Sequence, residues 1–194
     1  MKAMLIDENR NLVWSDVENP TVGPRDVLIE IHAAALNRAD LLQRQGKYPS
    51  PKGCPPWMGL EVAGIVCETG AEVTRWRTGD RVCALLGGGG YAEYVAVDEG
   101  MVMPVPGGLS FEEAASLPEA YATCYLNLFR EGGYRPGETL FFPAGASGLA
   151  SVGIPMAKAF GAYVITSVLT DEIAEKIAPL RADRVIVSSR EDTI

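Results

Sequence analysis

Short hydrophobic runs separated by turn residues fill the chain as far as Leu117. Runs of this kind, bounded by Gly, Pro, Asn and Asp, predict β-strands. We expect strands over residues 1–6, 12–14, 26–35, 61–68, 81–85 and 91–97, a short helix over 36–44 and a proline-rich loop over 48–56. Many short strands with regular turns predict a β-barrel or a β-sandwich.

The pattern changes near Pro118, where apolar strands begin to alternate with helical stretches. A short helix is expected to begin at Ser110, because Ser110 and Glu113 have the spacing of a capping box. We expect strands over 139–142, 162–166 and 184–187, and helices over 118–130, 148–160 and 171–178. This alternation predicts a parallel α/β unit. The first of these strands is almost wholly apolar, which predicts a strand covered on both faces of its sheet. We therefore expect two domains, 1–117 and 118–194.

Charge and hydropathy narrow the classes of partner. The chain has 194 residues and a formal net charge of −8, with a sequence pI near 4.7. Nucleic acid and anionic membrane surfaces repel such a protein, so neither is expected as a partner. No run approaches the ~18 apolar residues of a membrane span, and the N-terminus lacks a signal-peptide pattern. We expect a cytoplasmic protein.

The histidine and cysteine content argues against metal chemistry. His32 is the only histidine, which excludes HExxH metalloproteases and most catalytic zinc sites. It lies in an apolar run and is expected to be a structural strand residue. The four cysteines, Cys54, Cys67, Cys83 and Cys124, form no CxxC pair, so structural zinc and dithiol chemistry are not indicated. Free thiols fit a reducing compartment.

A turn of small residues between the 139–142 strand and the following helix is the main candidate for ligand binding. Gly145, Ser147 and Ala150 take the three glycine places of a dinucleotide fingerprint. Small residues let backbone N–H groups approach a pyrophosphate at a helix N-terminus. The candidate cofactor-binding residues are Ala144, Gly145, Ala146, Ser147, Gly148 and Leu149. A tight strand-to-helix connection without a ligand explains the motif alone equally well.

Five stretches carry a family resemblance. They are residues 35–48, Gly59-Leu-Glu-Val-Ala-Gly64, Gly79-Asp-Arg-Val82, residues 84–94 and Leu117-Pro-Glu-Ala-Tyr-Ala-Thr123. With them the chain resembles the zinc-independent quinone oxidoreductases of the medium-chain dehydrogenase/reductase superfamily, most closely the p53-inducible quinone oxidoreductase group. Zinc-dependent relatives carry a cysteine near Asn37 and a histidine at Leu60, and this chain has neither.

The resemblance implies an α/β protein with a β-barrel, in which a GroES-like barrel domain is followed by a partial Rossmann domain. It also implies NADPH in the cleft between the domains. The substrates would be quinones or other electron-poor carbonyl or alkene compounds (enones), reduced by hydride transfer without zinc.

Individual roles follow from the resemblance. Tyr48 would hydrogen-bond the substrate oxygen, although it can also be a loop tyrosine packed on the barrel. Asn37 and Asp40 would lie beside the nicotinamide, although a helix N-terminus also favours these residue types. Thr123 would contact the nicotinamide, although a helical threonine can bond its own backbone. No dedicated acid or base is demanded, because hydride chemistry belongs to the cofactor.

The turn that selects the cofactor departs from the family. Residues 166–170 contain no acid to hold a ribose 2′-hydroxyl, which favours NADPH over NAD. Ser167 and Thr170 can hydrogen-bond a 2′-phosphate. The family's phosphate-binding lysine falls on Ile173 and a nearby glycine falls on Leu169. The adjacent acids at 171 and 172 would repel a phosphate unless they point away.

Three further departures concern the fold. Residues 138–194 supply about three of the roughly six strands of a Rossmann sheet, so the resemblance covers about three-fifths of the family's length. Pro155 lies inside a predicted helix, and a kink is expected near Ser151. Ala150 replaces a family glycine, and its methyl group can crowd the pyrophosphate or the helix–strand contact.

Three functional readings stay open. The first is an NADPH-dependent quinone or enone reductase. The second is a truncated, non-catalytic family member or a fragment that acts as an interaction module. The third is an enoyl reductase of a biosynthetic assembly line. An unpaired edge strand and an uncovered apolar face also predict self-association, as a homodimer or a higher oligomer.

Overall fold

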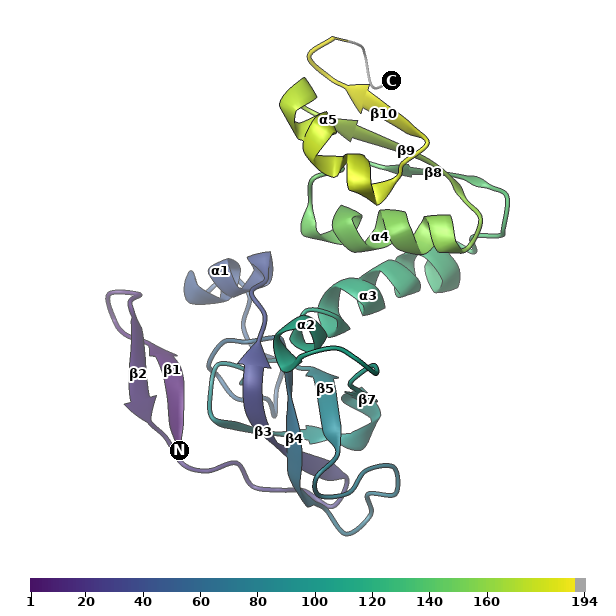
Figure 1. Ribbon diagram of the computed structural model, residues 1–194. Coiled ribbons are helices and arrows are strands. Elements are labelled where there is room, and N and C mark those ends of the chain that lie inside the picture. Colours follow the sequence, from purple (N-terminus) through teal and green to yellow (C-terminus); the bar gives the residue numbers. More distant parts are fainter. Residues whose placement is uncertain (191–194) are drawn as a thin grey trace. The chain divides into compact units, whose positions relative to one another are not determined.

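The computed structural model describes residues 1–190, so the last four residues of the predicted second domain lie outside the described part. The chain divides into two compact units, one from Met1 to Glu119 and one from Ala120 onward. The first unit is built mainly from antiparallel strands, and the second combines a parallel sheet with helices (Figure 1).

A five-stranded antiparallel sheet, in the order β6-β3-β4-β5-β7, forms the centre of the first unit. Its strands are β3 (Asp26–Ala34), β4 (Glu61–Thr69), β5 (Arg81–Leu85), β6 (Tyr94–Asp98) and β7 (Val102–Pro104). β4 pairs with both β3 and β5, and its first half is buried. Because β4 has a partner strand on each side, the sheet satisfies its backbone polar groups. The apolar sequence of β4 therefore suits its buried position in the middle of the sheet.

β-Branched side chains fill the core of this unit. Val27 and Ile29 of β3 are fully buried, whereas Glu30 between Ile29 and Ile31 is exposed, which is the alternation of a strand with one covered face. They pack with side chains from the other strands of the sheet. The buried members of this core are Val27, Ile29, Val62, Val66, Val82, Ala84, Leu86, Val95 and Val102.

A hairpin of β1 (Lys2–Ile6) and β2 (Leu12–Asp16) begins the chain. The predicted turn between them is closed by Asp7, whose Oδ1 accepts a 2.7 Å hydrogen bond from the Asn11 backbone N–H. Ala3 joins the hairpin to the rest of the unit through an isolated antiparallel bridge with Ala92.

Four predicted boundaries are wrong by two or three residues, namely the starts of α1 (Arg38–Arg44) and β6 and the ends of β2 and β9 (Tyr163–Val168). Helix α1 begins after Asn37, because Asn37 is extended and its backbone N–H donates to Asp40 Oδ2 at 2.6 Å. The strand expected from residue 91 begins only at Tyr94, because the Tyr91 backbone N–H donates to Met58 O instead. The short elements η1 (Glu99–Met101) and β7 were not expected from the sequence.

Short helices follow the sheet. α2 (Phe111–Ala115) begins at the predicted capping box, in which Ser110 Oγ accepts from Glu113 N and Glu113 Oε2 accepts from Ser110 N. α3 (Pro118–Tyr125) continues into a π-helical segment, η2 (Leu126–Glu131), which ends at Gly132. The predicted helix over 118–130 is confirmed, but its second half is wound more widely than an α-helix.

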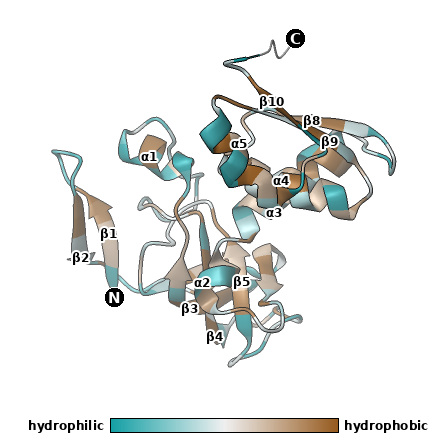
Figure 2. Cartoon of the chain, turned by 45° about the horizontal axis from the view of Figure 1, so that its top comes forward, coloured by the Kyte–Doolittle hydropathy of each residue, from teal (hydrophilic) through white to brown (hydrophobic). Residues whose placement is uncertain are grey.

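The second unit contains a parallel sheet in the order β10-β9-β8. Its elements are β8 (Thr139–Phe142), α4 (Gly148–Ala159), β9 (Tyr163–Val168), α5 (Asp171–Ile177), η3 (Ala178–Leu180) and β10 (Arg184–Val187). Both helices connect a strand to its next neighbour in the same direction, so right-handed crossovers place them on one face of the sheet. Figure 2 shows the hydrophobic colouring concentrated in α4 and the strands. The predicted parallel α/β architecture is confirmed.

The opposite face of this sheet is open. Leu140 and Phe142 pack with α4, whereas Phe141, which lies between them, is 49% exposed. Tyr163 of β9 is 48% exposed. The prediction that strand 139–142 is covered on both faces is therefore wrong for the described residues, because α4 and α5 share one face.

Pro155 lies inside α4, as its position in the sequence indicates, and the helix runs on to Ala159. Proline has no backbone N–H, so the Ser151 carbonyl receives no helical hydrogen bond from residue 155. The side chain of residue 155 is exposed. None of the helices in residues 1–190 is both long enough and apolar enough to cross a membrane.

Candidate functional site

The turn that leads from β8 into α4 is folded tightly against β9. Ala144 has a φ of 55°, and its carbonyl accepts a 2.8 Å hydrogen bond from Ser147 N. Gly145 N donates to Ser167 O at 2.8 Å. A Cβ at Gly145 would collide with Thr166 Oγ1, so only glycine allows the turn to approach β9 this closely.

The N-terminus of α4 has open space and free donors. Ser147 caps the helix, with its Oγ accepting from Ala150 N at 3.2 Å. In the part of the chain that the structure describes, the N–H groups of Gly148 and Leu149 have no acceptor, and a Cβ at Gly148 would meet nothing within 4 Å. Such N–H groups, together with the helix dipole, attract anions.

A cavity of about 400 Å³ lies beside this turn. It is lined by Ala144, Gly145, Ala146, Ser147, Ser167, Val168, Leu169, Ile173 and Ser188. The lining contains no charged side chain, so neither an acid for a ribose hydroxyl nor a cation for a 2′-phosphate is supplied there. The predicted residues Ala144 to Ser147 and Ser167 are brought together, whereas Gly148, Leu149 and Thr170 are outside the lining.

The two acids that follow the predicted cofactor-selecting turn, residues 166–170, form ion pairs with basic side chains. Asp171 forms an ion pair with Arg190, and Glu172 pairs with Lys176 Nζ at 2.7 Å. Thr170 caps α5, with its Oγ1 accepting from Ile173 N at 3.4 Å. Local partners thus reduce the repulsion that these acids would exert on a phosphate.

The side chain of Ala150 is buried in the core, whereas that of Leu149 is exposed. Ala150 is 1% exposed and packs in the core with Ile154 and Ala157, so its methyl group fills the helix–strand contact. The Leu149 side chain is 47% exposed, and its carbonyl accepts from Cys124 Sγ at 3.4 Å.

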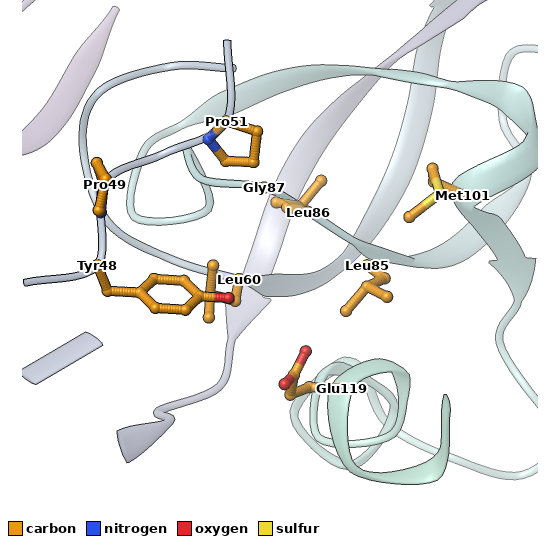
Figure 3. A pocket seen from close by; sticks show the side chains of 9 residues that line it. All are labelled: Tyr48, Pro49, Pro51, Leu60, Leu85, Leu86, Gly87, Met101 and Glu119. Atoms are coloured by element: carbon orange, nitrogen blue, oxygen red, sulfur yellow. The ribbon is translucent and has the colours of Figure 1, made fainter. Parts of the chain in front are cut away.

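A second cavity, of about 290 Å³, lies in the first unit. Its lining combines apolar side chains with two polar ones, Tyr48 and Glu119 (Figure 3). Tyr48 comes from the proline-rich loop after α1 and is 44% exposed. Leu60, at the place where zinc-dependent relatives carry histidine, is one of the apolar wall residues. Within residues 1–190 no cluster of three or more His, Cys, Asp or Glu side chains can hold a metal ion.

A buried polar network that includes Asn37 and Asp40 lies in the same unit. Asp40 Oδ2 accepts from Asn37 N at 2.6 Å and from the Tyr91 hydroxyl at 2.7 Å. Asn37 Nδ2 donates to Glu61 Oε1 at 2.8 Å, and Glu61 Oε2 accepts from Glu119 N at 2.8 Å. Asp40 Oδ1 is buried and has no hydrogen-bond partner in the described part of the chain. The lining of the Tyr48 cavity does not include Asn37 or Asp40.

Two glutamates in this region have raised pKa values. Burial raises the pKa of Glu61, and the charge of Asp40 adds to that increase. Burial, with the charges of Glu61 and Asp40, also raises the pKa of Glu119. Burial and the hydrogen bond to Asp40 raise the pKa of Tyr91 far above its usual range. Close acids in a site of low polarity cannot all ionise at their ordinary pKa values.

Sequence reasoning missed Glu61, Tyr91 and Glu119. The signal for Glu61 was an ionisable residue at the start of an otherwise apolar run, residues 60–66. Thr123 of α3 is half-buried, and its main-chain carbonyl accepts from Asn127 Nδ2 at 2.8 Å. It lines neither of the two cavities.

Comparison with known proteins places these features in context. The sequence profile of the alcohol dehydrogenase GroES-like domain matches residues 23–107. A quinone oxidoreductase of Pseudomonas aeruginosa is 37% identical over 164 residues, which are 84% of this chain and 50% of that protein. The chain spans about half the length of the curated relatives it matches.

Solved structures give the same picture. A quinone oxidoreductase of Pseudomonas syringae pv. Tomato DC3000 is similar with a TM-score of 0.84 at 34% identity, covering 99% of this chain and 59% of that one. The enoyl reductase CurK is similar with a TM-score of 0.87 at 26% identity, covering 96% of this chain and 59% of that one.

Proposed function

Because the chain belongs to the quinone oxidoreductase type of the medium-chain dehydrogenases/reductases, we propose that it serves NADPH-dependent, zinc-independent reduction of quinones or other electron-poor carbonyl or alkene compounds. The observation that carries this proposal is the cavity beside the β8–α4 turn. In this proposal the first unit, which includes Glu119, holds the substrate, and the second unit contributes to the cofactor-binding domain.

The β8–α4 turn suits the diphosphate of a dinucleotide. Gly148 and Leu149 have free N–H groups, and the space in front of Gly148 admits a close approach of phosphate oxygens. The cofactor supplies the hydride when bound. The protein's part is to fix the diphosphate through Ala146, Ser147 and the first turn of α4.

NADPH is favoured over NADH because no acidic side chain lines the cavity, and an acid at this place is what recognises the ribose 2′-hydroxyl of NAD. The Ser167 and Thr170 hydroxyls are the candidate donors to the 2′-phosphate. Because Leu169 and Ile173 are apolar, these two hydroxyls would hold the 2′-phosphate without the help of a lysine.

On the substrate side, we expect the Tyr48 hydroxyl to donate a hydrogen bond to the oxygen of a quinone in the cavity of about 290 Å³ that Tyr48 lines. Apolar walls such as Leu60 and Leu85 suit an aromatic ring. The predicted contacts of Asn37, Asp40 and Thr123 with the nicotinamide stay predictions.

Titration of the chain with NADPH tests the proposal. We expect a saturable increase in NADPH fluorescence and a higher melting temperature, with a weaker response to NADH. If neither signal saturates with NADPH, the proposal fails.

A matched pair of glycine variants locates the binding. Gly148→Ala has free space and a helical position, so it is expected to keep or slightly raise the melting temperature while weakening NADPH binding at least tenfold. Gly107→Ala, which also has free space but lies in the first unit, is the control and should bind NADPH normally. Equal NADPH affinity in both variants would move the site away from α4.

Likeness to an enoyl reductase supports a second candidate, reduction of an enoyl thioester. Parallel assays with 1,4-naphthoquinone and a short enoyl thioester separate the two. A chain that binds no NADPH and reduces neither compound would instead fit a non-catalytic interaction module. The cytoplasmic location and the homodimer stay predictions.

A further inference from the structure

The carboxyl group of Glu119 is the one ionisable acid in the lining of the Tyr48 cavity. Both Tyr48 and Glu119 line this cavity, and Figure 3 shows the Tyr48 ring level with Leu60 and the Glu119 carboxyl group below Leu60 and Leu85. A cavity with apolar walls and two convergent polar groups is the usual form of a small-molecule site.

Buried and hydrogen-bonded neighbours fix the main chain of Glu119, whereas its carboxyl group is free to contact a ligand. Pro118, which begins α3, is fully buried, and the Glu119 N–H donates to Glu61 Oε2 at 2.8 Å. Among the described residues, the Glu119 carboxyl group has no hydrogen-bond or ion-pair partner. A fixed, unpartnered acid can therefore meet a ligand in the cavity.

The surroundings of Glu119 shift its pKa upward, first through burial. Glu61 from β4 and Asp40 from α1 face it, and both charges together with burial raise its pKa. The Tyr91 hydroxyl donates to Asp40 Oδ2, and Tyr48 is the other polar side chain in the cavity lining. No lysine, arginine or histidine lines the cavity to counter this effect. A general acid works best when its pKa lies near the working pH.

We propose that Glu119 is the proton donor for the reduced substrate, a catalytic acid with Tyr48 as the partner that orients the substrate oxygen. This proposal rests on the proposed function. For a quinone, the hydride that bound NADPH would supply forms an O–H bond at one carbonyl oxygen, and the electron pair displaced through the conjugated ring comes to rest on the other carbonyl oxygen. That oxygen then forms a bond to the Glu119 proton as the carboxyl O–H bond breaks. Water returns a proton to the Glu119 carboxylate, so quinone, NADPH and one proton give hydroquinone and NADP⁺.

Glutamine at this position keeps the shape of the side chain and removes the acid. With 1,4-naphthoquinone, Glu119→Gln is expected to lower kcat about 100-fold while NADPH affinity stays unchanged. The wild-type rate should fall as pH rises through the pKa of Glu119, and the variant should lose that limb of the profile. Glu119→Asp, which keeps an acid, should restore part of the rate together with the limb.

The control is Glu8→Gln, the same chemical change at an exposed residue of the β1–β2 turn. It should retain the wild-type rate and pH profile. A Glu119→Gln variant that is as active as this control, with the same pH profile, overturns the proposal. A melting temperature for each variant separates loss of the acid from loss of the fold.

A readout that does not depend on turnover uses the full chain with ¹³C-labelled glutamate carboxyl groups. The Glu119 resonance is assigned by its absence in Glu119→Gln. We expect 1,4-dihydroxynaphthalene, kept under argon, to shift this resonance and its titration midpoint while leaving the Glu8 resonance unmoved. An unmoved Glu119 resonance overturns the proposal. If the chain reduces no quinone, the proposed function fails, but this titration still decides whether Glu119 meets the ligand.

Discussion

At the scale of single residues, the first unit holds three acidic side chains that interact with one another. Asp40, Glu61 and Glu119 come from three different elements; besides burial, the charge of Asp40 raises the pKa of Glu61, and the charges of Glu61 and Asp40 raise that of Glu119. Asp40 and Glu61 are almost completely buried. Backbone and amide donors satisfy part of this charge, as the bonds of Glu61 to Asn37 and Glu119 show. The free energy that is still needed to hold these carboxylates charged raises the pKa values of Glu61 and Glu119.

This group of acids makes stability depend on pH in a definite direction. The pKa of Glu61 is higher in the folded chain than in the unfolded one, so the folded chain binds the proton more tightly. Its contribution is therefore fully present below the ordinary carboxyl pKa and is lost as pH rises through the folded-state pKa. The loss is at most about 1.4 kcal/mol per pH unit for one proton.

Glu61→Gln removes this titration. Urea unfolding at a series of pH values is expected to show a shallower fall in the free energy of unfolding for the variant than for the wild type. Glu68→Gln, on the exposed part of the same strand, should keep the wild-type slope. If Glu61→Gln has the wild-type slope as well, Glu61 does not carry a raised pKa.

At the scale of elements, α4 contains the clearest conflict between sequence and secondary structure. Pro155 removes one hydrogen bond from the helix that presents its N-terminus to the proposed cofactor. Because its side chain is exposed, replacement by a helix former leaves the core contacts of Ile154 and Ala157 in place.

Pro155→Gln is expected to stabilise the second unit by up to about 3 kcal/mol, the usual cost of a proline inside a helix. Thermal unfolding followed by helical circular dichroism measures the effect. Ala159→Gln, another exposed position of α4, controls for the added glutamine and should change the stability little. A Pro155→Gln variant no more stable than this control would mean that α4 has adapted to the proline.

Strands and helices of strong pattern could be predicted from the sequence, because local features fix them. The capping box at Ser110 and the apolar run 184–187 are found as expected. The start of β6 could not be predicted, since the long-range bond from Tyr91 to Met58 O decides it. The same reason explains the site: Ala144 to Ser147 are consecutive, whereas Glu61, Tyr91 and Glu119 meet only through the fold.

At the scale of the whole molecule, the open face of the parallel sheet is the surface that we expect to form the predicted homodimer. Phe141 and Tyr163 present large apolar surfaces from neighbouring strands, and β8 is an edge strand of its sheet. Exposed apolar faces and unpaired edges favour self-association. In the predicted homodimer, a second copy of the chain would cover this exposed face of the sheet.

Light scattering tests this last expectation. The wild-type chain should have a mass twice the 20.8 kDa of one chain, and Phe141→Lys should lower it to that of a monomer, because a buried lysine cannot be solvated across an apolar interface. Leu36→Lys adds the same charge at an exposed leucine of the first unit and should remain dimeric. A monomeric wild type contradicts the homodimer. A dimer that persists in Phe141→Lys places the interface elsewhere, so the two outcomes separate the oligomeric state from the surface that forms it.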